Sequence, residues 1–83
     1  MLSWMIVGPQ IRAARGLLGW TIDQLAEESG VRGWTIGRAE REEGIPGTRA
    51  EKLMKIQQAL EKGGIAFLDP SGGAGVRLRT GEE

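Results

Sequence analysis

Apolar residues near the start of the chain recur at the spacing of a helix. Ile11, Ala14 and Leu18 lie three or four positions apart, which places their side chains on one helical face. Pro9 suits the first turn, where its missing N–H costs nothing, and Gly19 supplies the left-handed conformation that commonly ends a helix. The pattern therefore predicts a first helix from about Pro9 to Leu18, with one buried face.

The second predicted helix begins at a capping box. Thr21 and Gln24 have the spacing at which each side chain accepts a hydrogen bond from the other residue's backbone N–H. Trp20, just before the cap, is expected to belong to the core and to pack on Leu25, a contact that sets the angle between chain and helix. Gly30 ends this helix after little more than two turns, so tertiary packing must hold it in place.

A third helix is predicted over residues 33–41, directly after a tight turn. Val31 in that turn is expected to be buried, and Ile36 and Ala39 give the helix an inward face. Residues 42–47 contain two glycines and a proline, which predicts a loop. The sequence thus places two short helices in succession, with the turn between them anchored in the core.

A second capping box, formed by Thr48 and Glu51, is expected to open a fourth helix. This helix stops at Gly63 and Gly64, because consecutive glycines disfavour its continuation. Its apolar stripe has helical spacing and consists of Leu53, Ile56 and Leu60.

Beyond the fourth helix the apolar period changes to that of a strand. Residues 65–79 predict a β-hairpin in which two short strands flank a loop rich in glycine. Leu2, Trp4 and Ile6 also alternate, so the N-terminus is a candidate third strand. The expected fold is mainly α: one domain over residues 1–83, with four helices followed by a C-terminal hairpin.

The composition argues against catalysis. The chain has no cysteine and no histidine, which removes thiol nucleophiles, disulfides, the commonest general base and the commonest metal ligand. Residues 72–75 are rich in glycine but lack the Lys and Ser/Thr of a phosphate-binding loop. Glu42 and Glu43 have no metal-binding neighbours and are expected to be solvated. We therefore expect neither an enzyme, nor a metal site, nor a bound cofactor.

The apolar run at residues 2–7 lacks the basic start of a signal peptide and is followed at once by Gly8 and Pro9. No stretch approaches the roughly 20 apolar residues that cross a bilayer. We expect a cytoplasmic protein without a membrane partner.

The charge balance counts against a nucleic-acid partner, because phosphate neutralisation supplies much of DNA affinity and the chain carries 11 basic and 11 acidic residues. The charges are nevertheless separated along the chain. Residues 21–30 carry three acids and no base, whereas residues 31–41 carry three arginines against one acid, Glu40. A DNA-binding protein with this sequence would have to present the second segment.

Residues 21–41 have the layout of a helix-turn-helix motif. Ala26 must be small where the two helices cross, Gly30 must accept a positive φ, and Val31 anchors the turn in the core. Together with the helices on either side, residues 9–62 resemble the xenobiotic-response-element (XRE) family of lambda-repressor-like, Cro-type transcriptional regulators. The positions that carry the resemblance are Arg15, Leu25-Ala26, Gly30-Val31, Thr35-Ile36 and Glu40.

The resemblance implies a structural ion pair between Arg15 and Glu40, and a third helix that enters the major groove of DNA. Two positions depart from the family. Ile22 stands where many members carry a glutamine at the start of the second helix, and Gly33 stands where many carry a polar base-reading side chain. The residues that match DNA-facing positions of the family are Arg32, Gly33, Trp34, Thr35, Gly37, Arg38 and Arg41.

Two functions remain open at this point. The first is a homodimeric transcriptional regulator that binds double-stranded DNA with its third helix and pairs through the C-terminal hairpin. The second is a protein-interaction module on the same scaffold, in which Trp34 and Ile22 form an apolar patch for a regulator or toxin-like partner. The hairpin residues expected at the dimer interface are Ile65, Phe67, Val76 and Leu78.

Overall fold

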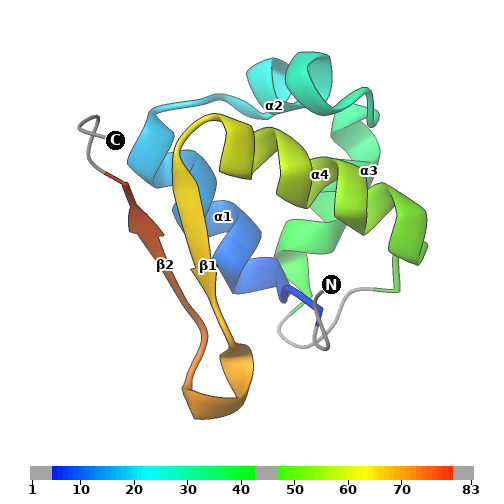
Figure 1. Ribbon diagram of the computed structural model, residues 1–83. Coiled ribbons are helices and arrows are strands. Elements are labelled where there is room, and N and C mark those ends of the chain that lie inside the picture. Colours follow the sequence, from blue (N-terminus) through cyan, green and yellow to red (C-terminus); the bar gives the residue numbers. More distant parts are fainter. Residues whose placement is uncertain (1–4, 43–46, 80–83) are drawn as a thin grey trace.

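The computed structural model describes residues 5–42 and 47–79, and in them it contains four α-helices followed by a two-stranded antiparallel sheet (Figure 1). This confirms the expected mainly α fold with a C-terminal hairpin. The elements are α1 (Gly8–Leu18), α2 (Ile22–Ser29), α3 (Gly33–Arg41), α4 (Ala50–Lys62), β1 (Ile65–Leu68), a 3-10 turn (Pro70–Gly72) and β2 (Gly75–Leu78).

Local capping signals fix the bounds of the first two helices. The predicted capping box of α2 is present: the Thr21 hydroxyl accepts from the Gln24 N–H at 3.1 Å, and the Gln24 amide oxygen accepts from the Thr21 N–H at 2.7 Å. Gly19 and Gly30 end the two helices at φ values of 70° and 76°, in the left-handed region that glycine favours. The bounds of these helices therefore follow from the sequence to within one residue.

The capping box predicted for the fourth helix is wrong. The N-cap of α4 is Arg49, which makes no side-chain capping bond, and the helix begins at Ala50. Thr48 thus lies one residue too early for its hydroxyl to reach the first free N–H groups of the helix.

Glu42 was expected to be solvated, but its carboxylate accepts a hydrogen bond from the Gly47 N–H at 2.6 Å. Glu43, the other acid expected to be solvated, lies outside the described residues.

A single cluster of buried apolar side chains holds the four helices and β1 together. Val31 is buried as predicted, and the half-buried Trp20 packs against the cluster from its edge. The buried members are Ile6, Ile11, Ala14, Leu25, Val31, Ile36, Ala39, Leu53, Ile56, Ala59, Leu60 and Ile65.

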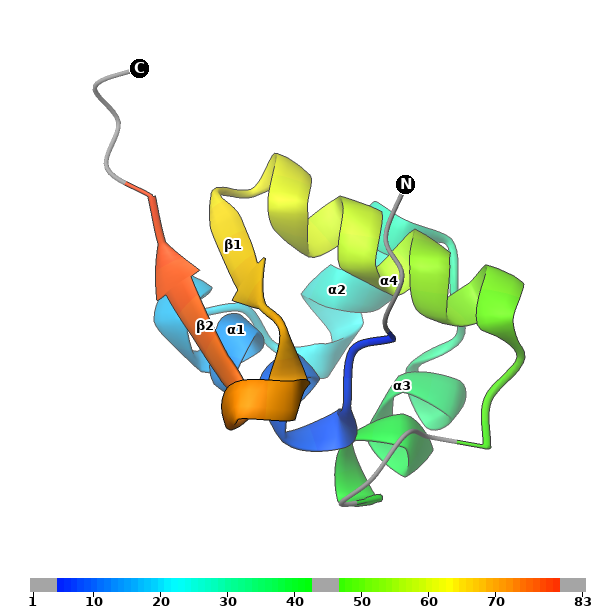
Figure 2. The same ribbon diagram turned by 60° about the horizontal axis from the view of Figure 1, so that its bottom comes forward.

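The hairpin lies against α1 and α4 on the side of α1 that is away from α3 (Figures 1 and 2). Its strands pair in the register Ile65 with Leu78. Gln10, 1% exposed, ties α1 to the hairpin: its amide nitrogen donates to the carbonyls of Leu68 at 2.7 Å and Gly75 at 2.9 Å. The hairpin therefore leaves the outer face of α3 uncovered.

The described residues form no third strand. Ile6 is buried, but its segment is not paired with the sheet, because the positions next to it serve to cap α1: the Val7 N–H donates to the Gln10 side chain at 2.9 Å. Leu2 and Trp4, the other two residues of the predicted strand, lie outside the described residues.

The start of α1 packs closely on the end of α3. A Cβ on Gly8 would overlap the backbone carbonyl oxygens of Glu42 and Ala39, so only glycine fits there. Arg12 donates to the Glu40 carbonyl at 2.5 Å. The positive end of one helix thus faces the negative end of the other, an arrangement that the helix dipoles favour.

Candidate nucleic-acid interface

A two-point ion pair fixes α3 to α1. The structure brings together Arg15 and Glu40, the pair that the family resemblance implies: Nε donates to one carboxylate oxygen at 2.8 Å and a terminal nitrogen donates to the other at 3.0 Å. Arg15 also donates to the Trp20 carbonyl at 3.0 Å. These bonds to Glu40 raise the pKa of Arg15 above its ordinary value, although partial burial acts in the opposite direction. This ion pair, which is mostly shielded from solvent, therefore fixes the orientation of α3 on α1.

The outer face of α3 carries three exposed arginines and an exposed tryptophan. Arg32 precedes the helix, Arg38 lies in its second half and Arg41 ends it, and all three are exposed. Trp34 is 70% exposed, which rules out its folding back into the core. The Arg38 guanidinium lies 5.7 Å from the centre of the indole ring, a cation–π distance.

Thr35 does not belong to this face. It is 9% exposed and lies on the inner side of α3 next to Ile36. Its position in the family predicted that Thr35 faces DNA, but only about half of the residues in one turn of α3 lie on the outer side of the helix. The burial of Thr35 contradicts its expected place among the DNA-facing residues.

Ile22 lies over the two glycines of α3. Its Cγ2 atom would be 3.2 Å from a Cβ on Gly33, and its Cδ1 atom would be 3.8 Å from a Cβ on Gly37. Both glycines are half-buried, as is Ile22, which also packs against the core. The two departures from the family thus form one packing unit, in which an aliphatic side chain on α2 packs against a part of α3 that bears no side chain.

The charges near α3 differ from the neutral balance of the whole chain. Glu40, the acid within α3, is 5% exposed and already paired, so the charges that α3 presents to solvent are those of its arginines. The carboxylate of Asp23, on the first turn of α2, lies 3.8 Å from the position of a Cβ on Gly33 and is the acid beside this face. The balance at the face is therefore positive.

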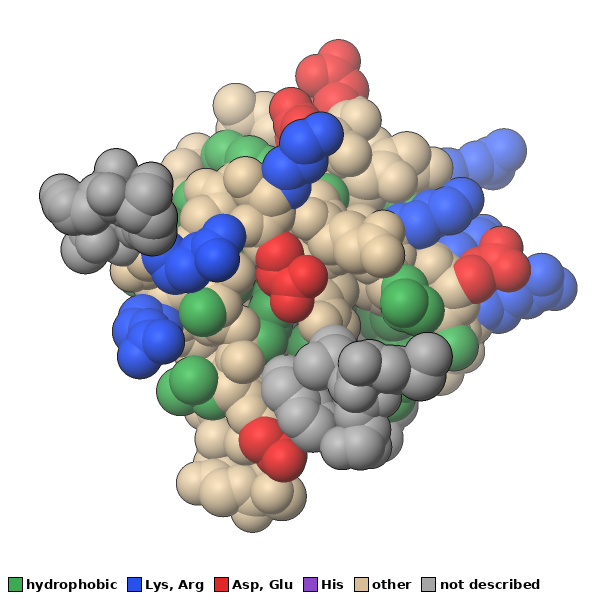
Figure 3. Space-filling view, viewed as in Figure 1, with side chains coloured by type: hydrophobic (Ala, Val, Ile, Leu, Met, Phe, Trp, Pro, Cys, Tyr) green, Lys and Arg blue, Asp and Glu red, His purple; other side chains and the backbone are tan. Residues whose placement is uncertain are grey.

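Basic residues at the start of α4 were missed in the sequence reasoning. The helix begins on the side of the molecule where α3 lies, and Lys and Arg side chains gather there with an acidic group among them (Figures 1–3). The charged residues of this stretch are Arg49, Glu51, Lys52 and Lys55. A count of charge over residues 49–55 would have indicated this cluster.

The comparison with known families decides what this scaffold is. The sequence profile of the helix-turn-helix family matches residues 11–64, more than half of the chain. The chain belongs to the helix-turn-helix family. This confirms the lambda-repressor-like XRE type that the sequence resembles, and it supports a DNA-binding regulator. No curated protein matches the chain.

The hairpin of this helix-turn-helix protein is only partly available to a second subunit. Ile65 is 1% exposed and belongs to the core of its own chain, so its expected place in a dimer interface is wrong. Phe67 and Val76 are half-buried against the same core. Leu78 is 46% exposed, as expected for an interface residue, and Leu68 is 45% exposed.

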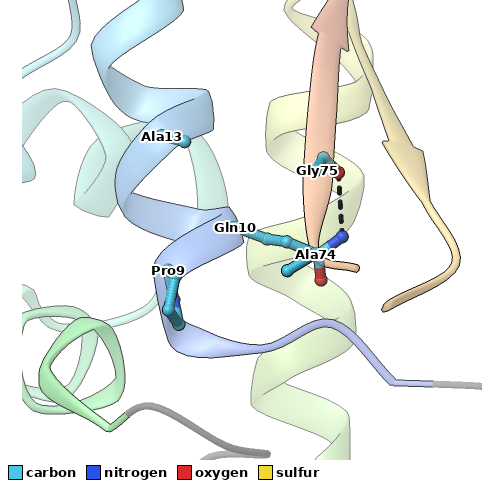
Figure 4. Close-up of a pocket in the computed structure, with 5 residues that line it drawn as sticks. All are labelled: Pro9, Gln10, Ala13, Ala74 and Gly75. Carbon is cyan, nitrogen blue, oxygen red and sulfur yellow. Dashed lines mark hydrogen bonds between the residues drawn. The ribbon is translucent and has the colours of Figure 1, made fainter. Parts of the chain in front are cut away.

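A hollow beside the hairpin offers no chemistry. It lies between the start of α1 and the start of β2, and the amide of Gln10 that points across it already donates to Gly75 (Figure 4). Among the residues that the structure describes, no charged side chain lines it. The lining residues are Pro9, Gln10, Ala13, Ala74 and Gly75.

Within residues 5–42 and 47–79, none of the helices has the length and apolar content needed to cross a membrane.

Proposed function

We propose that the protein is a transcriptional regulator that inserts α3 into the major groove of double-stranded DNA. The observation that carries the proposal is the outer face of α3, where Arg32, Arg38 and Arg41 are exposed while Glu40 is paired and buried. A helix of this kind, second in a helix-turn-helix motif, presents its side chains to base edges and phosphates. The family supports DNA binding; the groove and the contacts are our proposal.

Each arginine has a separate proposed role. Arg32 and Arg41 bracket α3 and contact phosphates, which sets the register of the protein without reading sequence. Arg38 contacts a guanine edge or a phosphate next to Trp34. Gly33 and Gly37 bear no side chain, so the backbone of α3 can approach the groove closely. Arg49, Lys52 and Lys55 extend the phosphate contacts at the start of α4.

The salt dependence of DNA binding tests this function. With a labelled random-sequence duplex, fluorescence anisotropy should show affinity that falls steeply as salt rises, because bound phosphates release their counterions. The double variant Arg38→Ala, Arg41→Ala should bind more weakly and with a smaller salt slope. The variant Lys62→Ala removes an exposed charge at the end of α4, away from both α3 and the hairpin, and should bind as the wild type does. Equal losses in both variants would refute the role of α3.

We also propose that the regulator acts as a homodimer, with half-sites about 34 Å apart or at a multiple of that distance. The exposed Leu78 on β2 supports the hairpin as the contact surface. Leu78→Lys should yield a monomer in sedimentation experiments, whereas Met54→Lys, which changes an equally exposed residue on α4, should not. A Leu78→Lys protein that stays dimeric would exclude the hairpin.

A second candidate function is a protein-interaction module. The exposure of Trp34 and the zero net charge favour it. In that case no duplex binds with a salt-dependent affinity, and the arginine variants behave as the wild type does. Of the patch first considered, Trp34 alone is freely available, because Ile22 is half-buried against the glycines of α3.

A further inference from the structure

The centre of the α3 face has few hydrogen-bonding side-chain groups. Between Arg32 and Arg38 the residues on the outer side are Gly33, Trp34 and Gly37, and Ile22 lies against the two glycines. The indole N–H of Trp34 is the one side-chain hydrogen-bonding group that these four residues offer, since glycine and isoleucine have none. A helix with this surface is poorly equipped to recognise bases through donors and acceptors.

We infer that this face recognises thymine through its methyl group. This inference rests on the proposed binding of α3 in the major groove. Of the groups that base pairs present there, the C5 methyl of thymine is the apolar one, and apolar side chains are its usual contacts. The exposed indole of Trp34, with arginines on either side of it along the chain, therefore matches a thymine edge set between phosphates.

Trp34 supplies the main contact. Its side chain is 70% exposed, so its surface is available to a ligand without any rearrangement of the core. The Arg38 guanidinium, 5.7 Å from the ring centre, accompanies the indole and places a positive charge next to it. A tryptophan that enters the groove is thereby accompanied by a group that attracts the neighbouring phosphate or guanine.

Gly37 governs how closely the helix approaches. A Cβ there would lie 3.8 Å from both the Arg41 guanidinium and Ile22, which are ordinary contacts, so Gly37→Ala can fold without displacing its neighbours. Alanine is also the better helix former. If Gly37 serves DNA binding, the alanine variant should gain stability and lose affinity for the selected site.

The test starts from the DNA sequences that the full chain selects from a random duplex pool. In the best site, each thymine is replaced in turn by deoxyuridine, which removes the methyl group and keeps the base pair. Burial of one such group corresponds to about 0.8 kcal/mol, or roughly fourfold in affinity. We expect a loss of about this size at one or two thymines of each half-site.

Protein variants assign that loss to α3. In Trp34→Ala the deoxyuridine substitution should have no further effect, because the contact is already gone; in Lys62→Ala, at an exposed residue at the end of α4, the fourfold loss should remain. A loss that persists in Trp34→Ala would overturn the inference. Circular dichroism checks that Trp34→Ala is folded, and Gly37→Ala provides a second variant with the same expected insensitivity.

The outcomes separate this inference from the proposed function. If binding is salt-dependent and sequence-specific but every thymine tolerates the loss of its methyl, the methyl recognition is wrong and α3 still binds DNA. If the selected site has no thymine at positions that the protein protects, the inference also fails. If no duplex binds at all, the DNA-binding function itself fails, and a protein partner for Trp34 takes its place.

Discussion

Removal of either member of the Arg15–Glu40 pair should destabilise the protein, but by unequal amounts. In Arg15→Met the Glu40 carboxylate remains at 6% side-chain exposure and loses bonds of 2.8 and 3.0 Å. An unpaired charge at such a site costs about 3–5 kcal/mol. In Glu40→Gln the arginine keeps its bond to the Trp20 carbonyl and 22% side-chain exposure, so we expect a loss of about 1–3 kcal/mol.

Urea unfolding followed by circular dichroism measures both losses. A domain of this length has a total stability of about 4–12 kcal/mol, so Arg15→Met should lose a large part of it and unfold at a much lower urea concentration. Arg77→Met, at an exposed arginine of β2, is the matched control and should change stability by no more than about 0.5 kcal/mol. Equal effects of Arg15→Met and Arg77→Met would refute the structural role of the pair.

The direction of the Arg15 pKa shift adds a pH signature. A raised pKa means that the contribution of Arg15 is fully present below the ordinary arginine pKa and is lost only as pH rises through the raised value. The difference in unfolding free energy between wild type and Arg15→Met should therefore be constant from about pH 6 to pH 9. A difference that shrinks across this range would mean that another group titrates in the site.

Four further substitutions test the packing of α1 and the acid beside the α3 face. Gly8→Ala should destabilise the protein by about 2–4 kcal/mol, because its Cβ would meet backbone carbonyls, whereas Gly16→Ala, with nothing within 4 Å, should stabilise α1 by up to about 1 kcal/mol; thermal unfolding of the two variants compares them. Gln10→Leu should cost about 2–3 kcal/mol and loosen the hairpin in hydrogen exchange, because two carbonyls lose their donor. Asp23→Asn should raise DNA affinity a few-fold at low salt, since it removes the acid beside Gly33; unchanged affinity would place Asp23 away from the bound phosphates.

Features coded by a few neighbouring residues were predictable from the sequence. The capping box of Thr21 and Gln24 and the glycine at position 30 set the bounds of α2, because capping depends on backbone groups within one turn. The same signal failed at Thr48, because the N-cap of the helix is Arg49, one residue later. A capping pattern shows that a helix can begin at a residue, and packing of the whole helix decides whether it does.

Features that depend on which side of an element meets the rest of the chain were less predictable. Alternation marked Ile65 and Phe67 as apolar positions of a strand, but it could not say that α1 and α4 would cover them and leave Leu78 outside. Position in the family likewise put Thr35 on the DNA side, and the packing of α3 put it inside. Burial in these cases depends on how two elements pack against each other, and the sequence of one segment does not show this.

The neutral net charge was the strongest sequence argument against DNA, and the packing of α1 on α3 changes its meaning. A sum over residues counts Glu40 as cancelling one of the arginines in residues 31–41. In the structure Glu40 is neutralised by Arg15, which belongs to a different helix, and the pair is withdrawn from the surface. The three arginines of the α3 face therefore act on a ligand without a counter-charge from residues 31–41, within the roughly 8–10 Å over which salt leaves such charges unscreened. The ion pair that fixes the orientation of α3 is thus also what makes its outer face basic.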